Sequence, residues 1–163
     1  MVLKRSNHHL KAICQHGEST YPNECCGLLL GKVVNSSKTV VEVRATENVW
    51  NAEAAQLFSG VEGTRGTNQL SNYTISPQTM LEVQKEVRDR TLQIIGIYHS
   101  HPNHPAIASE CDRLYAWEQY SYIIVSVMAG KAQELLCWEL DSDRTFQAEE
   151  IIIVNNLEKS KTK

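Results

Sequence analysis

Three residues in the second half of the chain have the types and spacing of metal ligands. His99 and His101 are separated by a single residue, and Asp112 follows after ten more. The apolar run 94–98 just before them is typical of a buried strand, in which positions i and i+2 point to the same face. Pro102 cannot donate to a strand ladder and is expected to end it. Two imidazoles and one carboxylate with an open fourth position form the ligand set of a catalytic metal site.

The carboxylate is expected to close this site from the first turn of a helix that begins at Ser109. A serine followed three residues later by an acid is also a plain helix start, with Ser109 as N-cap and Asp112 at N3. A lone histidine likewise is more often a surface or satisfied core residue than a ligand. The metal site is favoured because the histidine pair, the proline and the helix start fall within fourteen residues.

Hydrolysis at a metal site also needs a general base beside the metal-bound water. Glu24 is a candidate, since it opens a second apolar strand, Glu-Cys-Cys-Gly-Leu-Leu-Leu-Gly, that is flanked by turn residues. Taken alone, a glutamate at the head of a strand is better explained as a solvated strand end. Its role as a base therefore depends on the fold bringing it to the metal ligands.

Together these residues resemble the JAMM (MPN-plus) metalloprotease family. The family pattern is a Glu before a Gly- and Leu-rich strand, then His-x-His-Pro, then a Ser and an Asp three residues apart. This chain matches it without departure at Glu24, His99, His101, Ser109 and Asp112. The resemblance covers nearly the whole chain, and a five-residue pattern is far more specific than a bare His-x-His.

The resemblance implies a fold, a cofactor and a set of roles. The fold would be a single α/β domain with a mixed, curved β-sheet flanked by helices, the MPN or cytidine-deaminase-like architecture. One zinc ion per chain would be held by His99, His101 and Asp112, with water as the fourth ligand. Glu24 would be the general base, and Ser109 would help to stabilise the tetrahedral oxyanion.

A substrate class also follows from the resemblance. Compact single-domain members look like the prokaryotic branch of the family, some of which trim the C-terminus of small ubiquitin-like sulfur-carrier proteins. The expected activity is therefore cleavage of a peptide or isopeptide bond after the C-terminal Gly-Gly of a ubiquitin-like or sulfur-carrier protein. The tail would add to a strand edge near His99 by β-augmentation.

Three other classes stay open from the residues alone. One is a non-catalytic MPN scaffold, which the intact five-residue pattern disfavours. Another is a deaminase-like zinc hydrolase, which would need a Pro-Cys-x-x-Cys motif that the sequence lacks. The third is a non-haem iron enzyme, since two histidines and a carboxylate also suit iron.

Length and composition fit one small enzyme domain. We expect the domain to span residues 1–154 of the 163, followed by a disordered polar tail at 155–163. A net charge of -3 does not indicate the basic surface that nucleic-acid-binding proteins have. No apolar run is long enough to span a membrane. The N-terminus lacks the apolar core of a signal peptide, and the cysteine count of 5 is odd. These features predict a cytoplasmic protein whose cysteines act as small buried side chains.

The hydrophobic pattern predicts alternating helices and strands. Helices are expected over residues 6–19, from Ser76–Pro77 onward and from Ser109 to about Trp117. In the second of these, Met80, Leu81, Val83 and Val87 are expected to face inward. Strands are expected to follow Glu24, and over 38–44, 94–98, 120–128, 133–140 and 145–154.

The region 50–73 interrupts this alternation. It holds three glycines and many small polar residues, and structureless segments of that length are uncommon unless they are functional or disordered. If it lies over the substrate groove, Trp50, Leu57 and Phe58 are candidates for contacting the substrate. The alternative is an insertion without a role, and the sequence does not separate the two.

Overall fold

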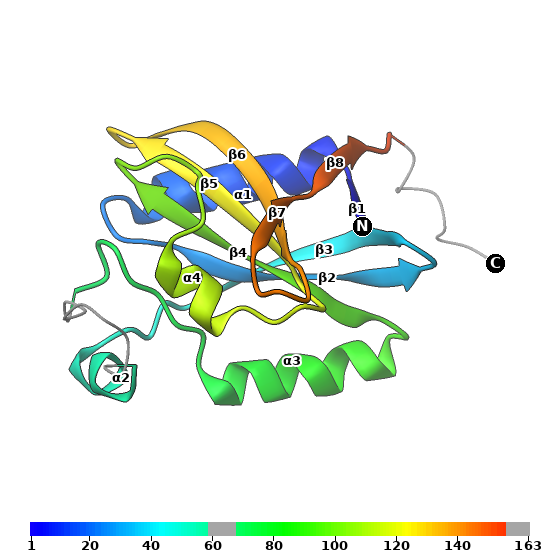
Figure 1. Cartoon of the computed structure of the whole chain (residues 1–163), viewed down its shortest axis with the longest axis horizontal. Coiled ribbons are helices and arrows are strands. Elements are labelled where there is room, and N and C mark those ends of the chain that lie inside the picture. The colour runs from blue at the N-terminus through cyan, green and yellow to red at the C-terminus, as the bar shows by residue number, and fades with distance from the viewer. Residues whose placement is uncertain (59–67, 156–163) are drawn as a thin grey trace.

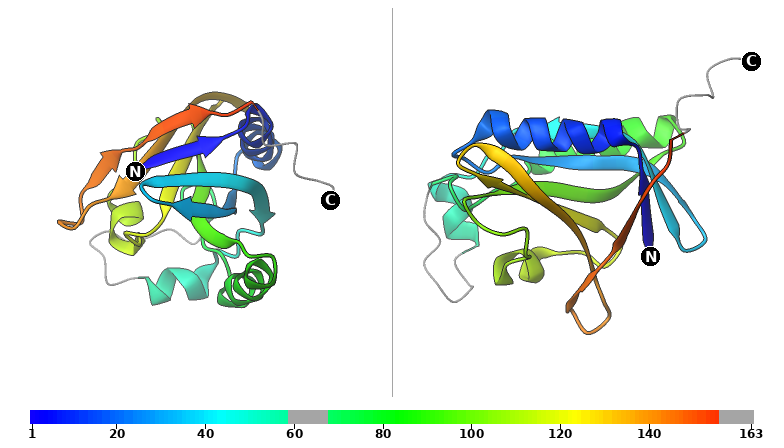
Figure 2. Two further views of the ribbon diagram at one scale, coloured as in Figure 1. Left: turned by 90° about the vertical axis from the view of Figure 1, so that its right-hand side faces the viewer. Right: turned by 90° about the horizontal axis from the view of Figure 1, so that it is seen from above.

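The backbone is built around one curved sheet of eight strands. The computed structural model describes residues 1–58 and 68–155, and the strand order in its sheet is β7-β6-β5-β4-β2-β3-β1-β8 (Figures 1 and 2). The sheet is strongly curved, like a barrel that is not fully closed (Figure 2). β7 and β8 are its two edge strands. The strands are β1 Val2–Arg5, β2 Cys26–Val34, β3 Ser37–Thr46, β4 Gln93–Pro102, β5 Ser121–Met128, β6 Lys131–Leu140, β7 Phe146–Ala148 and β8 Glu150–Ile153. The helices are α1 Asn7–Thr20, α2 Ala52–Leu57, α3 Pro77–Asp89 and α4 Glu110–Tyr115. The predicted single α/β domain with a mixed, curved sheet is confirmed.

The strand that carries the histidine pair lies at the centre of this sheet. β4 is antiparallel to β2 on one side and parallel to β5 on the other. A bulge in its pairing with β2 falls between Leu29 and Leu30, where Ile95 is skipped in the register. Ile97, His99 and His101 therefore share one face of the strand beyond the bulge, as the period of two requires.

Helices cover both faces of the sheet. α1 packs Ile13 into a core with Leu29, Tyr98 and Val125, and α3 packs Val83 and Val87 into a second core on the opposite face. α1 approaches the sheet closely at Gly17, where an added Cβ would lie 3.1 Å from Val127 Cγ2. This close fit places a rigid layer behind the strand ends that bear the histidines.

Both long helices begin where the sequence indicates. Ser6 caps α1 and accepts a hydrogen bond from the backbone N–H of His9. Ser76 caps α3 in the same way, and Pro77 is its first helical residue. The expectation that Leu81 faces inward is wrong, because its side chain is 51% exposed. Residues 80, 83 and 87 already fill the face of α3 toward the sheet, and position 81 is turned about 100° from 80.

The chain ends pair in a way the sequence does not indicate. The predicted single strand over 145–154 is divided at Glu149 into β7, which pairs with β6, and β8, which pairs in parallel with β1. β1 itself was not expected. The parallel pairing of β8 with β1 joins segments far apart in sequence, so no local turn residues indicate it.

The region 50–73 is only partly irregular. Residues 52–57 form α2, with Asn51 as its N-cap, which corrects the expectation of a structureless loop there. Residues 59–67, and 156–163 of the expected disordered tail, lie outside the described residues. Within the described ranges, no helix is long and apolar enough to cross a membrane.

Candidate metal centre

The two histidines lie near the C-terminal end of β4. His99 is fully buried, and its Nε2 atom lies 3.1 Å from the Nε2 atom of His101. Each backbone is held by the sheet, since His99 is paired with Cys26 on β2 and Ile124 on β5. β4 ends at Pro102, as predicted. The pair is thus fixed by the most deeply buried part of the fold.

The carboxylate comes from α4, which lies near the carboxyl end of β4 (Figure 1). Asp112 Oδ1 is 3.3 Å from His99 Nε2, and its Oδ2 is 3.6 Å from His101 Nε2. Ser109 holds Oδ2 through its backbone N–H and its hydroxyl, both at 2.7 Å. In return, the Asp112 N–H donates to the Ser109 Oγ. Oδ1 is thereby left to face the histidines.

A loop behind the histidines fixes the ring of His101. Its Nδ1 donates to the carbonyl of Pro105 at 2.8 Å, so that its Nε2 carries the free lone pair. The loop is tied to the sheet by two further bonds, from Ser126 Oγ to the His104 carbonyl and from Trp138 Nε1 to the Ala106 carbonyl. His104 itself is an exposed loop residue at the cavity wall.

The ring of His99 is held differently. Tyr73 stacks on it, with ring centroids 4.5 Å apart and planes 21° from parallel. The Nδ1 atom of His99 is buried and has no hydrogen-bond partner in the part of the chain that the structure describes. Tyr73 was not identified from the sequence, and nothing in its neighbourhood, at the end of the region 50–73, signals such a contact.

The charges of the cluster favour a bound cation. Burial opposes the ionisation of Asp112, but His99, His101 and the Ser109 N–H together hold the pKa of this carboxyl well below its usual range. Burial alone would lower the pKa of His101, but the hydrogen bond and charge of Asp112, with the Pro105 carbonyl, raise it. An ionised carboxylate facing two imidazoles is the charge pattern of a site for a divalent cation.

The three ligand atoms also fit zinc in their spacing. One ligand atom from each of His99, His101 and Asp112 lies within 4.8 Å of the other two. Tetrahedral ligands at the usual zinc distances are about 3.3 Å from one another. Here the two Nε2 atoms are 3.1 Å apart, and the Asp112 carboxylate lies 3.3 Å from His99 Nε2 through Oδ1 and 3.6 Å from His101 Nε2 through Oδ2. The predicted metal ligands therefore converge on one point.

The predicted base lies in the same cavity. Glu24 precedes β2 and is 7% exposed, and its backbone is held by Gln69 and Asn48. A cavity of about 930 Å³ is lined by Glu24 together with His101, Ser109 and Asp112. The alternative of a solvated strand end does not fit its burial. Glu24 lines the same cavity as the ligand cluster but is not one of the three converging residues.

The predicted substrate contacts divide into three cases. Phe58 lines the cavity, and its ring meets that of Tyr115 on α4 edge to face at 4.6 Å. Trp50 is only 2% exposed and stacks on Phe58 from behind, so it supports the cavity wall rather than facing the substrate. Leu57 is 79% exposed and belongs to a second, adjoining cavity of about 760 Å³. The two cavities share the residues Phe58, Thr74, Ile75, Met80, Ile97 and Trp117.

The cysteines form no disulfide among the described residues. Burial raises the pKa of Cys25 to about 11 and that of Cys26 to about 12, which keeps both thiols protonated. This agrees with their interpretation as small buried side chains. Cys111, next to Asp112, lines the metal-site cavity but is not one of the converging ligands.

Fold and site together define an α/β domain with a candidate metal centre at the carboxyl end of a central strand. Residues 6–141 match a family described as "Prokaryotic homologs of the JAB domain". The chain belongs to this family, which confirms the resemblance to JAMM proteins seen in the sequence pattern.

Individual relatives agree with this assignment. The chain is 25% identical over 148 residues to "Desampylase" from Pyrococcus furiosus, covering 90% of this chain and 86% of that one. A solution structure from Salinibacter ruber is 28% identical, with a TM-score of 0.67 over 94% of this chain and 92% of that one. A solution structure from Desulfitobacterium hafniense, 24% identical, has the same fold, with a TM-score of 0.74 over 96% of both chains.

Proposed function

We propose that this protein is a zinc-dependent metallopeptidase of the JAMM type. The observation that carries the proposal is the convergence of His99, His101 and Asp112 at the wall of a cavity that Glu24 also lines. A scaffold without activity would have no need of a base beside an intact ligand cluster. Family membership and the distant similarity to "Desampylase" support a metallohydrolase.

The chain's own residues have separable roles in this proposal. His99, His101 and Asp112 would hold the zinc ion, which when bound supplies a water of pKa near 7 and polarises the substrate carbonyl. Glu24 would act as the general base that takes a proton from the attacking water and as the acid that protonates the leaving amine. Pro105 keeps His101 in the tautomer with a free Nε2. Ser109 donates to the developing oxyanion, for which its hydroxyl must turn away from Asp112.

The substrate we propose is the C-terminal Gly-Gly tail of a ubiquitin-like or sulfur-carrier protein. The similarity to "Desampylase" supports a ubiquitin-like tail. We expect the tail to lie along a strand edge near His99. Up to His99 both edges of β4 are already paired, with β2 and β5, so this part of β4 is not the edge that the tail uses. Two irregular segments, 71–75 and 104–107, contribute to the walls of the cavity and offer the alternative. Glycines suit a passage between them because they have no side chain to exclude.

Replacing Glu24 by glutamine tests the base. Glutamine keeps the size of the side chain but cannot take a proton, so zinc should stay bound while turnover falls by about 10²–10⁴. The assay is cleavage of a Gly-Gly-tailed carrier protein fused to a short peptide, with metal content measured on the same sample. Glu82→Gln, an exposed change on α3, is the matched control.

Each other outcome has a separate meaning. Loss of zinc from Glu24→Gln would make Glu24 a metal ligand, and unchanged turnover with full zinc would refute the mechanism. His101→Ala should abolish metal binding, and full occupancy in that variant would contradict the ligand assignment. Iron rather than zinc in protein purified without chelator or added metal would favour the non-haem iron class.

A further inference from the structure

The helix that carries the third ligand has little to hold it in place. α4 is six residues long, far shorter than a helix that is stable alone, and none of its apolar residues is buried. Leu114 is 36% exposed and Tyr115 is 41% exposed, so apolar burial contributes little to its position. Asp112 nevertheless lies within a few ångströms of two buried histidines. Apart from the contacts of Asp112 with the histidines and of the Tyr115 ring with Phe58, the helix is held by polar contacts at its two ends.

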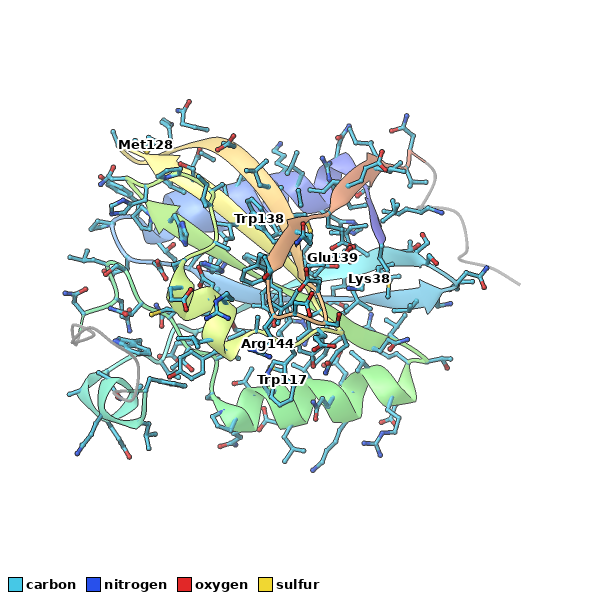
Figure 3. The ribbon with its side chains drawn as sticks, viewed as in Figure 1. Lys38, Trp117, Met128, Trp138, Glu139 and Arg144 are labelled. Carbon is cyan, nitrogen blue, oxygen red and sulfur yellow. The ribbon has the colours of Figure 1, made fainter. Side chains whose placement is uncertain are left out.

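At its C-terminal end, these contacts come from one arginine. The Nη2 atom of Arg144 donates to the carbonyls of Arg113, Leu114 and Ala116 at 3.0, 3.1 and 3.3 Å. Figure 3 shows Arg144 beside this end of the helix. The last carbonyls of a helix have no hydrogen-bond donors within it and carry partial negative charge. A guanidinium there supplies both the donors and a compensating positive charge.

The contact is reciprocal and is built on an ordered turn. Arg113 Nη1 donates to the Arg144 carbonyl at 3.2 Å. Arg144 has a φ of 58°, in the left-handed region, and its N–H donates to the Asp141 carbonyl. The Asp141 carboxylate accepts from the N–H groups of Asp143 and Thr145 and from the Gln147 side chain. This network holds the β6–β7 turn in the shape that aims Arg144 at α4.

We infer that Arg144 is a positioning residue that sets the register of α4 against β4. Through the helix it places Asp112 opposite His99 and His101, and it places Ser109 at the rim of the same cavity. Arg144 also lines that cavity, so replacing it should change the site as well as the turn. The inference rests on the proposed metal centre but not on the identity of the substrate.

The test replaces Arg144 by glycine. Glycine adopts a φ of 58° without strain, so the turn and the fold should survive while the contact to α4 is lost. Zinc affinity, measured by competition with a chelator, should fall about 10–100-fold, as for other residues that orient metal ligands. In metal-free protein, hydrogen exchange of the Arg113 amide, which bonds to the Ser109 carbonyl, should become faster. With zinc saturating, kcat should fall by a larger factor than KM rises.

Two further variants make the test specific. Arg144→Lys keeps a cation that can donate to the same carbonyls and should recover most of the zinc affinity. Arg90→Ala removes an exposed arginine that binds Glu42 and Glu86 far from α4, and it should change neither zinc affinity nor exchange at Arg113.

The outcomes separate this inference from the proposed function. Unchanged zinc affinity and unchanged exchange in Arg144→Gly would overturn it. A rise in KM alone, with zinc affinity intact, would also overturn it and make Arg144 a substrate contact. If the wild-type protein binds zinc but does not cleave the carrier fusion, the proposed function fails, whereas exchange and zinc affinity still decide the role of Arg144.

Discussion

The metal centre joins two regions that the fold holds in different ways. His99 and His101 stand on a central strand with paired neighbours on both sides, and His99 is fully buried. Asp112 stands on α4 and Ser109 caps that helix, which buries no apolar residue and is held by polar contacts at its two ends and by the contact of Tyr115 with Phe58. The strand half shares the stability of the core, whereas the helix half depends on a few polar contacts. Such a helix can open locally without unfolding the sheet.

This difference assigns separate tasks to the two halves. The strand half presents two imidazoles in a preformed geometry, which lowers the cost of ordering them when metal binds. The helix half, together with Phe58 and Tyr115, forms the wall on the other side of the cavity. In the proposed function, the substrate would enter between these two walls.

The largest effect should come from the core beneath the strand half. Ile124 is fully buried and lies opposite His99 in the β4–β5 pairing. Ile124→Ala should lower the free energy of unfolding by about 2–5 kcal/mol. Leu114→Ala on α4 should change it by no more than about 0.5 kcal/mol. Urea unfolding of the metal-free proteins measures both, and equal losses would contradict the division into two halves.

A smaller and more local effect is expected at Ser109, where helix capping and catalysis can be separated. Alanine removes the hydroxyl and the cap, at about 1 kcal/mol for the cap, whereas glycine as N-cap costs only a few tenths. If Ser109 stabilises the oxyanion, both variants should lose about 10²–10³ in kcat. Only Ser109→Ala should speed hydrogen exchange in α4. Near-normal kcat in Ser109→Gly would leave Ser109 with the capping role alone.

The smallest effect concerns an ion-pair network that belongs to neither half. Glu86 on α3 accepts hydrogen bonds from Arg44 and Arg90, which lower its pKa from 4.5 to about 2. A lowered folded-state pKa stabilises the fold above pH 4.5, and this contribution is lost as the pH falls from 4.5 toward 2. The effect should be small because the network is exposed to solvent.

The measurement is the difference in urea midpoint between wild type and Glu86→Gln as a function of pH. The difference should shrink across that acid range, and zinc affinity at neutral pH should be the same in both proteins. A difference independent of pH would show that the network does not contribute through the charge of Glu86.

Local signals in the sequence were sufficient for much of the fold. Ser6, Ser76 and Ser109 cap the helices they were expected to begin, because capping depends on residues within one turn. The hairpin turn at Ala129–Gly130 has the positive φ values that such turns require. The prediction that Leu81 faces inward was wrong, because periodicity alone does not say how wide the buried face of a helix is.

The sequence by itself determined the ligand types and the common face of His99 and His101, since both follow from spacing along one strand. It also determined that Ser109 and Asp112 share the first turn of a helix. Only the tertiary structure decided that Glu24 is buried in the same cavity, that Tyr73 stacks on His99 and that Arg144 holds α4. It also decided that β8 pairs with β1. These relations join residues distant in the chain, and they arise from how the sheet closes and which segments it brings together, which no local pattern encodes.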